Sequence, residues 1–252
     1  MFAPEDLTDD AFLCGRLRLW QPAKGYRAAT DPVLLAAAVP ARAGQSVLDL
    51  GCGAGAASLC LAARVPGLAQ AGLELQPGYA DLARRNAARN GTALEVVAGD
   101  LAQMPGVLRR SFDHVMANPP YYAPQGTPSP DAGRDTALRV ATPIAAWIEA
   151  ATRRLTPGGT LTLILATDRL PEVLCALGTR LGSALVLPLA AREGRPAARV
   201  IVQARKGGRA AFRLQAPLIL HGGPAHDGDR ESYTPTANAV LRDGGDLLAQ
   251  LK

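Results

Sequence analysis

Ser46-Val47-Leu48-Asp49-Leu50-Gly51-Cys52-Gly53-Ala54-Gly55 decides the fold of this 252-residue chain. Its first half is an apolar run, typical of a strand that is buried on both faces. Three glycines then alternate with small residues, and the helix-compatible segment 56–64 follows. Glycines let the backbone approach a ligand, and a helix N-terminus supplies free N–H groups. This order therefore predicts one unit of a parallel α/β sheet with a ligand at the loop.

A carboxylate follows the glycine loop at a defined distance. The next strand-like run, 71–74, ends in Glu74, 19 positions after Gly55. That spacing fits a carboxylate that receives both ribose hydroxyls of a nucleoside cofactor. A dinucleotide-binding protein would use the same loop and the same spacing, so these two features leave the cofactor open.

The rest of the chain continues the alternation of strands and helices. We expect helices over 31–39, 77–90, 143–155 and 169–180, and strands over 94–98, 112–117, 160–166, 184–189 and 198–204. The turn 192–196 between the last two strands is too short for a parallel crossover, which predicts an antiparallel pair at the end of the sheet. The pattern predicts an α/β fold with a seven-stranded, mostly parallel sheet, an antiparallel end strand and helices on both faces.

The two ends of the chain are expected to add to this core. Residues 11–28 predict a hairpin or extended arm, and residues 212–220 predict a further extended segment before a short helix to about Arg242. Within the core, Pro157-Gly158-Gly159 predicts a turn before the strand 160–166. We expect a single domain over 1–252, made of an N-terminal arm and helix (1–40), a Rossmann-like core (41–205) and a C-terminal extension (206–252).

Asn118-Pro119-Pro120-Tyr121-Tyr122, directly after the strand 112–117, is where we expect the chemistry. Two consecutive prolines stop the backbone from continuing as a central strand or entering a helix, so the run lies at the carboxyl edge of the sheet, where ligands bind. Asp100 lies just after the strand 94–98 and is either an acceptor for a cofactor amine or a capping residue. An amide, a rigid turn and two aromatic rings suit a flat group that carries an amino function.

The C-terminal half carries the net charge of +5, because residues 1–122 contain 11 Lys+Arg and 11 Asp+Glu. Seven basic residues in 192–213, among them Arg192 and Arg195, stand against one acidic residue. Such an excess attracts phosphates, and a solvated arginine-rich surface is the alternative. Residues 123–138, rich in Pro and Gly, predict a substrate-gripping loop in which Arg134 and Arg139 are the candidate phosphate contacts.

These motifs, in this order, resemble the class I S-adenosylmethionine-dependent methyltransferases, and Asn118-Pro119-Pro120-Tyr121 is similar to the motif of those that methylate an exocyclic amino or amide nitrogen. The resemblance implies S-adenosylmethionine as the cofactor. It implies catalytic roles for Asn118, Pro119, Pro120 and Tyr121, and substrate contact by Tyr122. The cofactor contacts it implies are Thr30, Asp49, Gly51, Cys52, Gly53, Gly55, Glu74, Leu75, Asp100, Leu101 and Asn118.

The chemistry of this motif follows from the weakness of adenine N6 as a nucleophile. If the Asn118 side-chain oxygen and the Pro119 carbonyl each accept one N6–H, the nitrogen is pushed toward tetrahedral geometry and its lone pair is aimed at the methyl donor. The same oxygens stabilise the positive charge that develops on nitrogen. Tyr121 would stack on a base that has rotated away from its neighbours.

A narrower resemblance covers nearly the whole chain. The segment Gly25–Leu35 is similar to the opening segment of the tRNA1(Val) adenine-N6 methyltransferase family, and 233–235 with 241–244 is similar to its C-terminal tail. The resemblance implies that the Thr30-Asp31 region helps to close the cofactor pocket. It also implies that the substrate is an adenosine beside a tRNA anticodon, adenosine 37 of a tRNA such as tRNA1(Val). Where the family commonly has Phe after Asn-Pro-Pro-Tyr, this chain has Tyr122.

Composition bounds the location and the partners. No apolar stretch reaches the length of about 18 residues that a membrane span needs, and the first residues are acidic where a secretory signal would be basic. We expect a cytoplasmic protein, with a monomer as the default. Cys14, Cys52, Cys60 and Cys175 form no Cys-x-x-Cys pair, so we expect neither a metal site nor a disulfide.

Other functions remain open on the sequence. A protein glutamine-N5 methyltransferase would share the Asn-Pro-Pro-Tyr chemistry, although the arginine excess suits phosphates better than a polypeptide. DNA adenine is a third substrate class. A non-catalytic protein that binds RNA or S-adenosylmethionine on the same scaffold is the alternative from another class. A nicotinamide dehydrogenase is weakest, because it leaves Asn118-Pro119-Pro120-Tyr121 unexplained.

Overall fold

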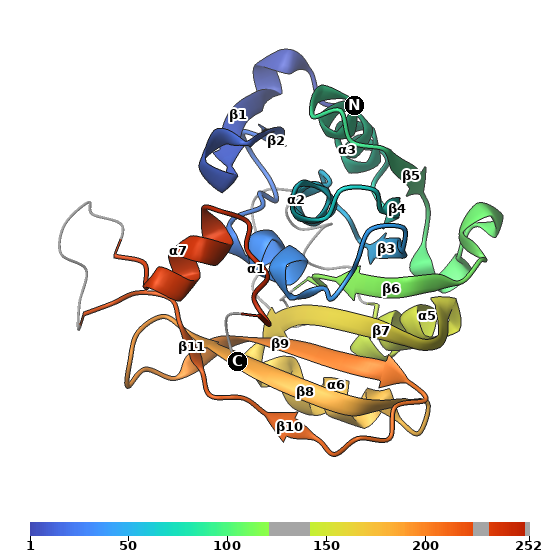
Figure 1. Cartoon of the computed structure of the whole chain (residues 1–252). Coiled ribbons are helices and arrows are strands. Elements are labelled where there is room, and N and C mark those ends of the chain that lie inside the picture. Colours follow the sequence, from blue (N-terminus) through green and yellow to red (C-terminus); the bar gives the residue numbers. More distant parts are fainter. Residues whose placement is uncertain (121–141, 224–231, 250–252) are drawn as a thin grey trace.

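The computed structural model describes residues 1–120, 142–223 and 232–249, and one large mixed sheet organises them (Figure 1). The strand order is β10-β8-β9-β7-β6-β3-β4-β5, and β11 also pairs with β8. The strands are β3 Ser46–Leu50, β4 Ala69–Glu74, β5 Leu94–Ala98, β6 Phe112–Ala117, β7 Leu155–Ala166, β8 Leu181–Ala190, β9 Ala197–Lys206, β10 Arg213–Leu214 and β11 Leu218–Ile219. The strands β3 to β9 are the seven that the sequence predicts.

The antiparallel pair is confirmed, and its position in the sheet is now defined. β9 runs antiparallel to both β7 and β8 and lies between them. The short turn after β8 reverses the chain directly, so β9 fills the space that the crossover from β7 to β8 leaves. The strand beyond the antiparallel one is therefore β8, and β10 and β11 pair with its outer edge in parallel.

The expected turn at Pro157-Gly158-Gly159 lies inside β7. Phe112 of β6 pairs with Leu155 and His114 pairs with Thr160, so the register shifts across these residues. Gly158 has a φ of +78°, which a residue with a side chain adopts only under strain. The segment is thus an irregularity that the strand absorbs, and the prediction of a turn before the strand was wrong.

Helices cover both faces of the sheet. α1 Thr30–Ala38 and α2 Ala56–Arg64 pack on one face, and α5 Ile144–Arg154 and α6 Leu170–Leu177 on the other. Because side chains alternate along a strand, Val47 of β3 joins the first core while Leu48 joins the second. The remaining helices are α3 Pro77–Arg89 and α7 Pro235–Leu241, with short 3₁₀ turns at Pro4–Asp6, Leu13–Gly15, Leu101–Gln103, Gly106–Leu108 and Thr167–Arg169.

The N-terminal arm is a hairpin of β1 Leu7–Phe12 and β2 Leu17–Pro22, as the sequence predicts. It lies near α3, away from the β8 edge (Figure 1). The buried Asn86 of α3 accepts a hydrogen bond from the Trp20 N–H (2.8 Å) and donates to the Trp20 carbonyl (3.0 Å). The arm is therefore hydrogen-bonded to α3. Each helix of the described residues is too short or too polar to pass through a bilayer.

Candidate active site

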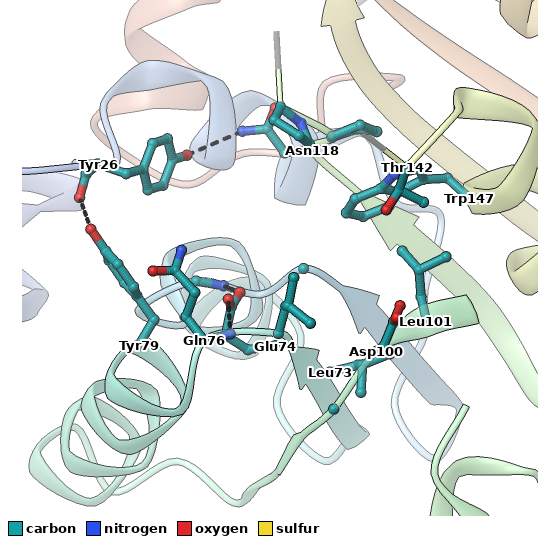
Figure 2. Close-up of a pocket in the computed structure, with 16 residues that line it drawn as sticks. Tyr26, Leu73, Glu74, Gln76, Tyr79, Asp100, Leu101, Asn118, Thr142 and Trp147 are labelled. Atoms are coloured by element: carbon teal, nitrogen blue, oxygen red, sulfur yellow. Dashed lines mark hydrogen bonds between the residues drawn. The ribbon is translucent and has the colours of Figure 1, made fainter. Parts of the chain in front are cut away.

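The carboxyl ends of β3, β4 and β6 open onto a cavity of about 870 Å³, including the part that is open to solvent (Figure 2). This is the edge at which the sequence places the site, because parallel strands end together there. The predicted residues that line the cavity are Gly51, Gly53, Glu74, Leu75, Asp100, Leu101, Asn118, Pro119 and Pro120.

Glu74 ends β4 and forms the acidic side of the cavity. It is 8% exposed, and its Oε2 accepts a hydrogen bond from the Gly53 N–H (2.9 Å) while its Oε1 accepts one from the Gln76 N–H (2.8 Å). Burial raises the pKa of this carboxyl, and the backbone hydrogen bonds oppose that effect. A carboxylate can accept about four hydrogen bonds, so Glu74 keeps acceptor capacity toward the cavity.

The glycine loop approaches the cavity with left-handed backbone at Gly51, Gly53 and Gly55 (φ of +69°, +54° and +88°). A Cβ at Gly51 would lie 2.8 Å from Cη2 of Trp147, so the indole packs directly on the loop. Gly55 precedes the first residue of α2 and does not line the cavity. The loop therefore brings backbone, rather than side chains, to the site.

Asn118 follows β6 on the opposite side of the cavity from Glu74 and Asp100 (Figure 2). Its Nδ2 donates a hydrogen bond to the phenol oxygen of Tyr26, at 3.5 Å. Pro119 and Pro120 continue the cavity wall. The expected contacts Tyr121, Tyr122, Arg134 and Arg139, and the loop 123–138, lie outside the described residues.

Asp100 caps a turn and lines the cavity. Its Oδ1 accepts a hydrogen bond from the Ala102 N–H at 2.8 Å, which caps the 3₁₀ turn Leu101–Gln103. The same residue lines the cavity. The capping interpretation is therefore right for one oxygen of the carboxylate.

A smaller cavity of about 380 Å³ adjoins the first and is lined by Asp49 and Cys52. Asp49 is 2% exposed, and its Oδ2 accepts a hydrogen bond from Oγ of Ser58 at 2.8 Å. Burial raises the pKa of Asp49 to about 7, and the nearby charge of Glu74 adds to this effect. Burial also raises the pKa of the Cys52 thiol, which packs on Gly72.

Four of the predicted residues that the structure describes lie outside both cavities, and Gly55 is one of them. Thr30 begins α1, and Arg192 and Arg195 lie in the turn between β8 and β9. Arg192 is 8% exposed and donates hydrogen bonds to the carbonyls of Gly222 and Gly223. Its guanidinium thus ties this turn to the C-terminal segment, whereas Arg195 is exposed.

Much of the basic excess in 192–213 is engaged within the fold. Arg199 pairs with Asp31 at 3.2 Å, Arg205 donates to the Gly158 carbonyl, and Lys206 donates to the Leu155 carbonyl. These contacts stabilise the fold. A count of charges along the sequence cannot tell basic residues of this kind from those that bind a ligand. Arg195, Arg205, Arg209 and Arg213 are the exposed members of the group, and of these Arg205 is the one bonded to Gly158.

Sequence reasoning missed several residues of the cavity wall, namely Tyr26, Leu73, Gln76, Tyr79, Gly99, Thr142 and Trp147. Tyr26 belongs to the segment Gly25–Leu35, whose resemblance to a family segment was a usable signal. Trp147 has the spacing of a core residue in α5, and the sequence does not show that its ring reaches a loop after β3. Within the described residues, no three of His, Cys, Asp and Glu gather in a way that could hold a metal ion.

Comparisons with known proteins bear on this cavity and its fold. The family model described as "Methyltransferase small domain" matches residues 29–183. A tRNA1(Val) (adenine(37)-N6)-methyltransferase from Dickeya chrysanthemi is 31% identical over 225 residues, which cover 85% of each chain. The protein of that name from Yersinia enterocolitica is 39% identical over 111 residues, which cover 43% of this chain and 44% of that one.

A solved structure, named as a predicted O-methyltransferase from Agrobacterium tumefaciens, has a TM-score of 0.68 at 29% identity and covers 85% of this chain and 96% of that chain. These matches confirm the expected Rossmann-like class I fold and the expected cofactor, S-adenosylmethionine. The chain therefore belongs to the methyltransferase small domain family and to the tRNA1(Val) (adenine(37)-N6)-methyltransferase family.

Proposed function

We propose that this chain transfers a methyl group from S-adenosylmethionine to the exocyclic N6 of adenine in a tRNA, with adenosine 37 of a tRNA such as tRNA1(Val) as the target. The observation that carries the proposal is the position of Asn118 and Pro119. Both line the cavity at the carboxyl end of β6, opposite the carboxylate of Glu74. One cavity thus offers a carboxylate for a ribose and an amide for an amine.

The residues around the cavity fit the cofactor. Glu74 is oriented by two backbone N–H groups and can still accept hydrogen bonds from both hydroxyls of a ribose. Leu75 and Leu101 give apolar contact to a flat base, and Asp100 keeps a carboxylate beside them. The glycines Gly51 and Gly53 leave room for a ligand beside the smaller cavity at Asp49, while the N–H groups of the loop are bonded to the Leu73 carbonyl and to Glu74.

The bound cofactor supplies an electrophilic methyl group on a sulfonium. The chain's own residues then have to hold the adenine amine in line with that group. Asn118 and the Pro119 carbonyl supply two acceptors for the two N6–H hydrogens, so they select a primary amine and orient its lone pair. Their oxygens also stabilise the positive charge that develops on the nitrogen, so no strong base is needed before the transfer.

The same arrangement also bears on whether a nitrogen or a hydroxyl oxygen receives the methyl group. A hydroxyl has to lose its proton to become a good nucleophile, which calls for a base beside it. The carboxylates of Glu74 and Asp100 lie across the cavity from Asn118, and Tyr26, Thr142 and Trp147 are the labelled neighbours on its side (Figure 2). Among the described residues that line this larger cavity, this distribution favours an amine over the oxygen acceptor that the Agrobacterium protein's name suggests.

A tRNA substrate adds phosphates outside the cavity and places the reaction in the cytoplasm. Arg195, exposed in the turn after β8, is the phosphate contact we retain from the predicted pair, because Arg192 is committed to the C-terminal segment. Arg134 and Arg139 remain proposed contacts of the loop that follows Tyr122.

Transfer of tritium from labelled S-adenosylmethionine to unmodified tRNA tests the proposal. The unaltered chain is expected to label tRNA, and Asn118→Ala is expected to lose at least about 100-fold in kcat, since it removes an acceptor that acts in the transition state. Calorimetry should show that the variant still binds the cofactor. Label in a protein substrate, with none in tRNA, would contradict the proposal.

A further inference from the structure

Tyr26 lies where the two cavities meet, since it lines both. Its phenol oxygen is 3.5 Å from Nδ2 of Asn118, which donates to it. In Figure 2 the ring of Tyr26 points toward the Asn118 amide. A side chain from outside the sheet thus reaches the residue that is proposed to orient the substrate.

The backbone around Tyr26 is held at three successive residues. The Tyr79 hydroxyl donates to the Tyr26 carbonyl at 3.1 Å. Arg27 pairs with Asp10 at 2.8 Å. The side chain of Gln21, 3% exposed, accepts from the Ala28 N–H (2.7 Å) and donates to the Ala28 carbonyl (3.3 Å). The loop that carries the phenol is therefore fixed before any ligand binds.

The hairpin that carries this loop is itself bonded to the cofactor loop. The buried Asn86 of α3 bonds both backbone groups of Trp20, and its Nδ2 also donates to the Ala54 carbonyl at 3.0 Å. Arg85 and Arg89 of the same helix lie over the Trp20 ring, at 5.3 and 4.5 Å from its centroid. The hairpin, α3 and the loop at Ala54 form one connected unit, which places Tyr26 relative to Asn118.

The orientation of the Asn118 amide matters because its two ends differ in chemistry. Oδ1 accepts hydrogen bonds and Nδ2 donates them, so only one of the two orientations presents an acceptor to an amine N–H. In the structure the Tyr26 oxygen accepts from Nδ2, so Oδ1 lies at the other end of the amide. Burial raises the pKa of the Tyr26 phenol, so this partner stays neutral at physiological pH.

We infer that Tyr26 is a positioning residue, which fixes the Asn118 amide so that its oxygen faces the substrate amine, and that the N-terminal hairpin serves to hold Tyr26 there. This role rests on the proposed function, because it concerns the orientation of the adenine acceptor. It gives the hairpin a part in catalysis, whereas its sequence suggests only an arm at the edge of the fold.

Tyr26→Phe removes the phenol oxygen and keeps the ring. Loss of one hydrogen bond that orients a transition-state acceptor is expected to lower kcat about 5-fold to 10-fold. The dissociation constant for S-adenosylmethionine, measured by calorimetry, and the thermal midpoint should stay within the error of the unaltered chain. Tyr233→Phe is the matched control, since that tyrosine stacks on His221, outside both cavities, and should leave kcat unchanged.

A double-mutant cycle then separates action through Asn118 from an independent effect. In the Asn118→Ala background, measured by single-turnover tritium transfer, adding Tyr26→Phe should cost less than 2-fold, because the amide that Tyr26 orients is gone. Equal losses in both backgrounds, or a Tyr26→Phe variant as active as the unaltered chain, would overturn this role alone. An unaltered chain that binds the cofactor but methylates no adenine would overturn the proposed function, and with it this role.

Discussion

Glu74 and Gly53 are joined by a hydrogen bond of 2.9 Å, from the backbone N–H of the glycine to the carboxylate. The end of β4 is thereby bonded directly to the loop that follows the neighbouring strand β3, in the wall of the cavity. The carboxylate orients the loop, and the loop orients the carboxylate. Cofactor binding is expected to depend on this pair as a unit.

Glu74→Gln tests that unit. A glutamine amide cannot accept from both the Gly53 and the Gln76 N–H groups, because one end of it is an NH₂ group. Calorimetry should show an affinity for S-adenosylmethionine about 10-fold to 100-fold weaker, as expected for the loss of a hydrogen bond to a charged group. Glu95→Gln, which alters an exposed carboxylate paired with Arg110, is the control and should bind normally. Equal affinities in both variants would contradict the role of Glu74.

Gly51→Ala is expected to disrupt the cavity through a direct clash. Its Cβ would meet Cη2 of Trp147 at 2.8 Å, in addition to the strain of a φ of +69°. Gly44→Ala carries comparable backbone strain, with a φ of +84°, but its Cβ meets nothing within 4 Å. Urea unfolding should therefore show a loss of about 1–2 kcal/mol for Gly44→Ala, from the strain alone, and a larger loss for Gly51→Ala. Weak binding of S-adenosylmethionine is expected only in Gly51→Ala.

Asp49 gives the fold a pH dependence of defined sign. The pKa of its carboxyl is about 7 in the folded chain, while an unfolded aspartate titrates near about 4. Between these values the folded chain holds a proton that the unfolded chain has lost, so the contribution of Asp49 to stability is greatest below about pH 4 and falls as the pH rises to about 7. The full difference is as much as about 4 kcal/mol, at 1.4 kcal/mol per pKa unit.

Asp49→Asn removes this titration and keeps an oxygen that can accept from Ser58. Urea unfolding without cofactor should show that the free energy of unfolding of the variant, relative to the unaltered chain, rises between pH 5 and pH 8. Taking the difference between the two chains cancels the titration of His114, whose pKa burial lowers. A difference that does not change with pH would mean that Asp49 stays ionised in the fold.

Arg192 and Arg195 should separate stability from RNA binding. Arg192→Gln breaks partly buried hydrogen bonds from the guanidinium to Gly222 and Gly223 and is expected to cost about 2 kcal/mol of unfolding free energy. Arg195→Gln alters an exposed side chain and should change stability by less than about 0.5 kcal/mol. Its effect should instead appear as weaker tRNA binding at low salt, in a filter-binding assay. An Arg192→Gln chain with the same free energy of unfolding as the unaltered chain would contradict a stabilising role for these hydrogen bonds.

Local patterns along the sequence predict most of this fold. The apolar run of β3, the glycines after it and the spacing to Glu74 each depend on neighbours within one strand–loop–helix unit, so they can be read in order. The helical spacing of α5 predicts its bounds to within a residue or two. The position of β9 between β7 and β8 depends on which strand a crossover passes over, and no local pattern carries that information.

The residues of the candidate site likewise fall into those that the sequence predicts and those that it does not. Asn118 and Glu74 lie at strand ends, where the topology of a parallel sheet brings polar residues together. Tyr26 and Trp147 reach the cavity from a hairpin and from a helix, and only the packing of distant elements determines that they do so. Arg192 has the sequence context of a surface charge and is buried by a C-terminal segment that begins beyond β9.

Mass spectrometry of nucleosides, digested from unmodified tRNA after incubation with the chain and S-adenosylmethionine, tests the central claim most directly. The account predicts N6-methyladenosine in the tRNA treated with the unaltered chain, and none above background with Asn118→Ala. Methylation of a ribose hydroxyl or of another base, or an unmodified tRNA together with methylated glutamine in a protein substrate, would contradict it.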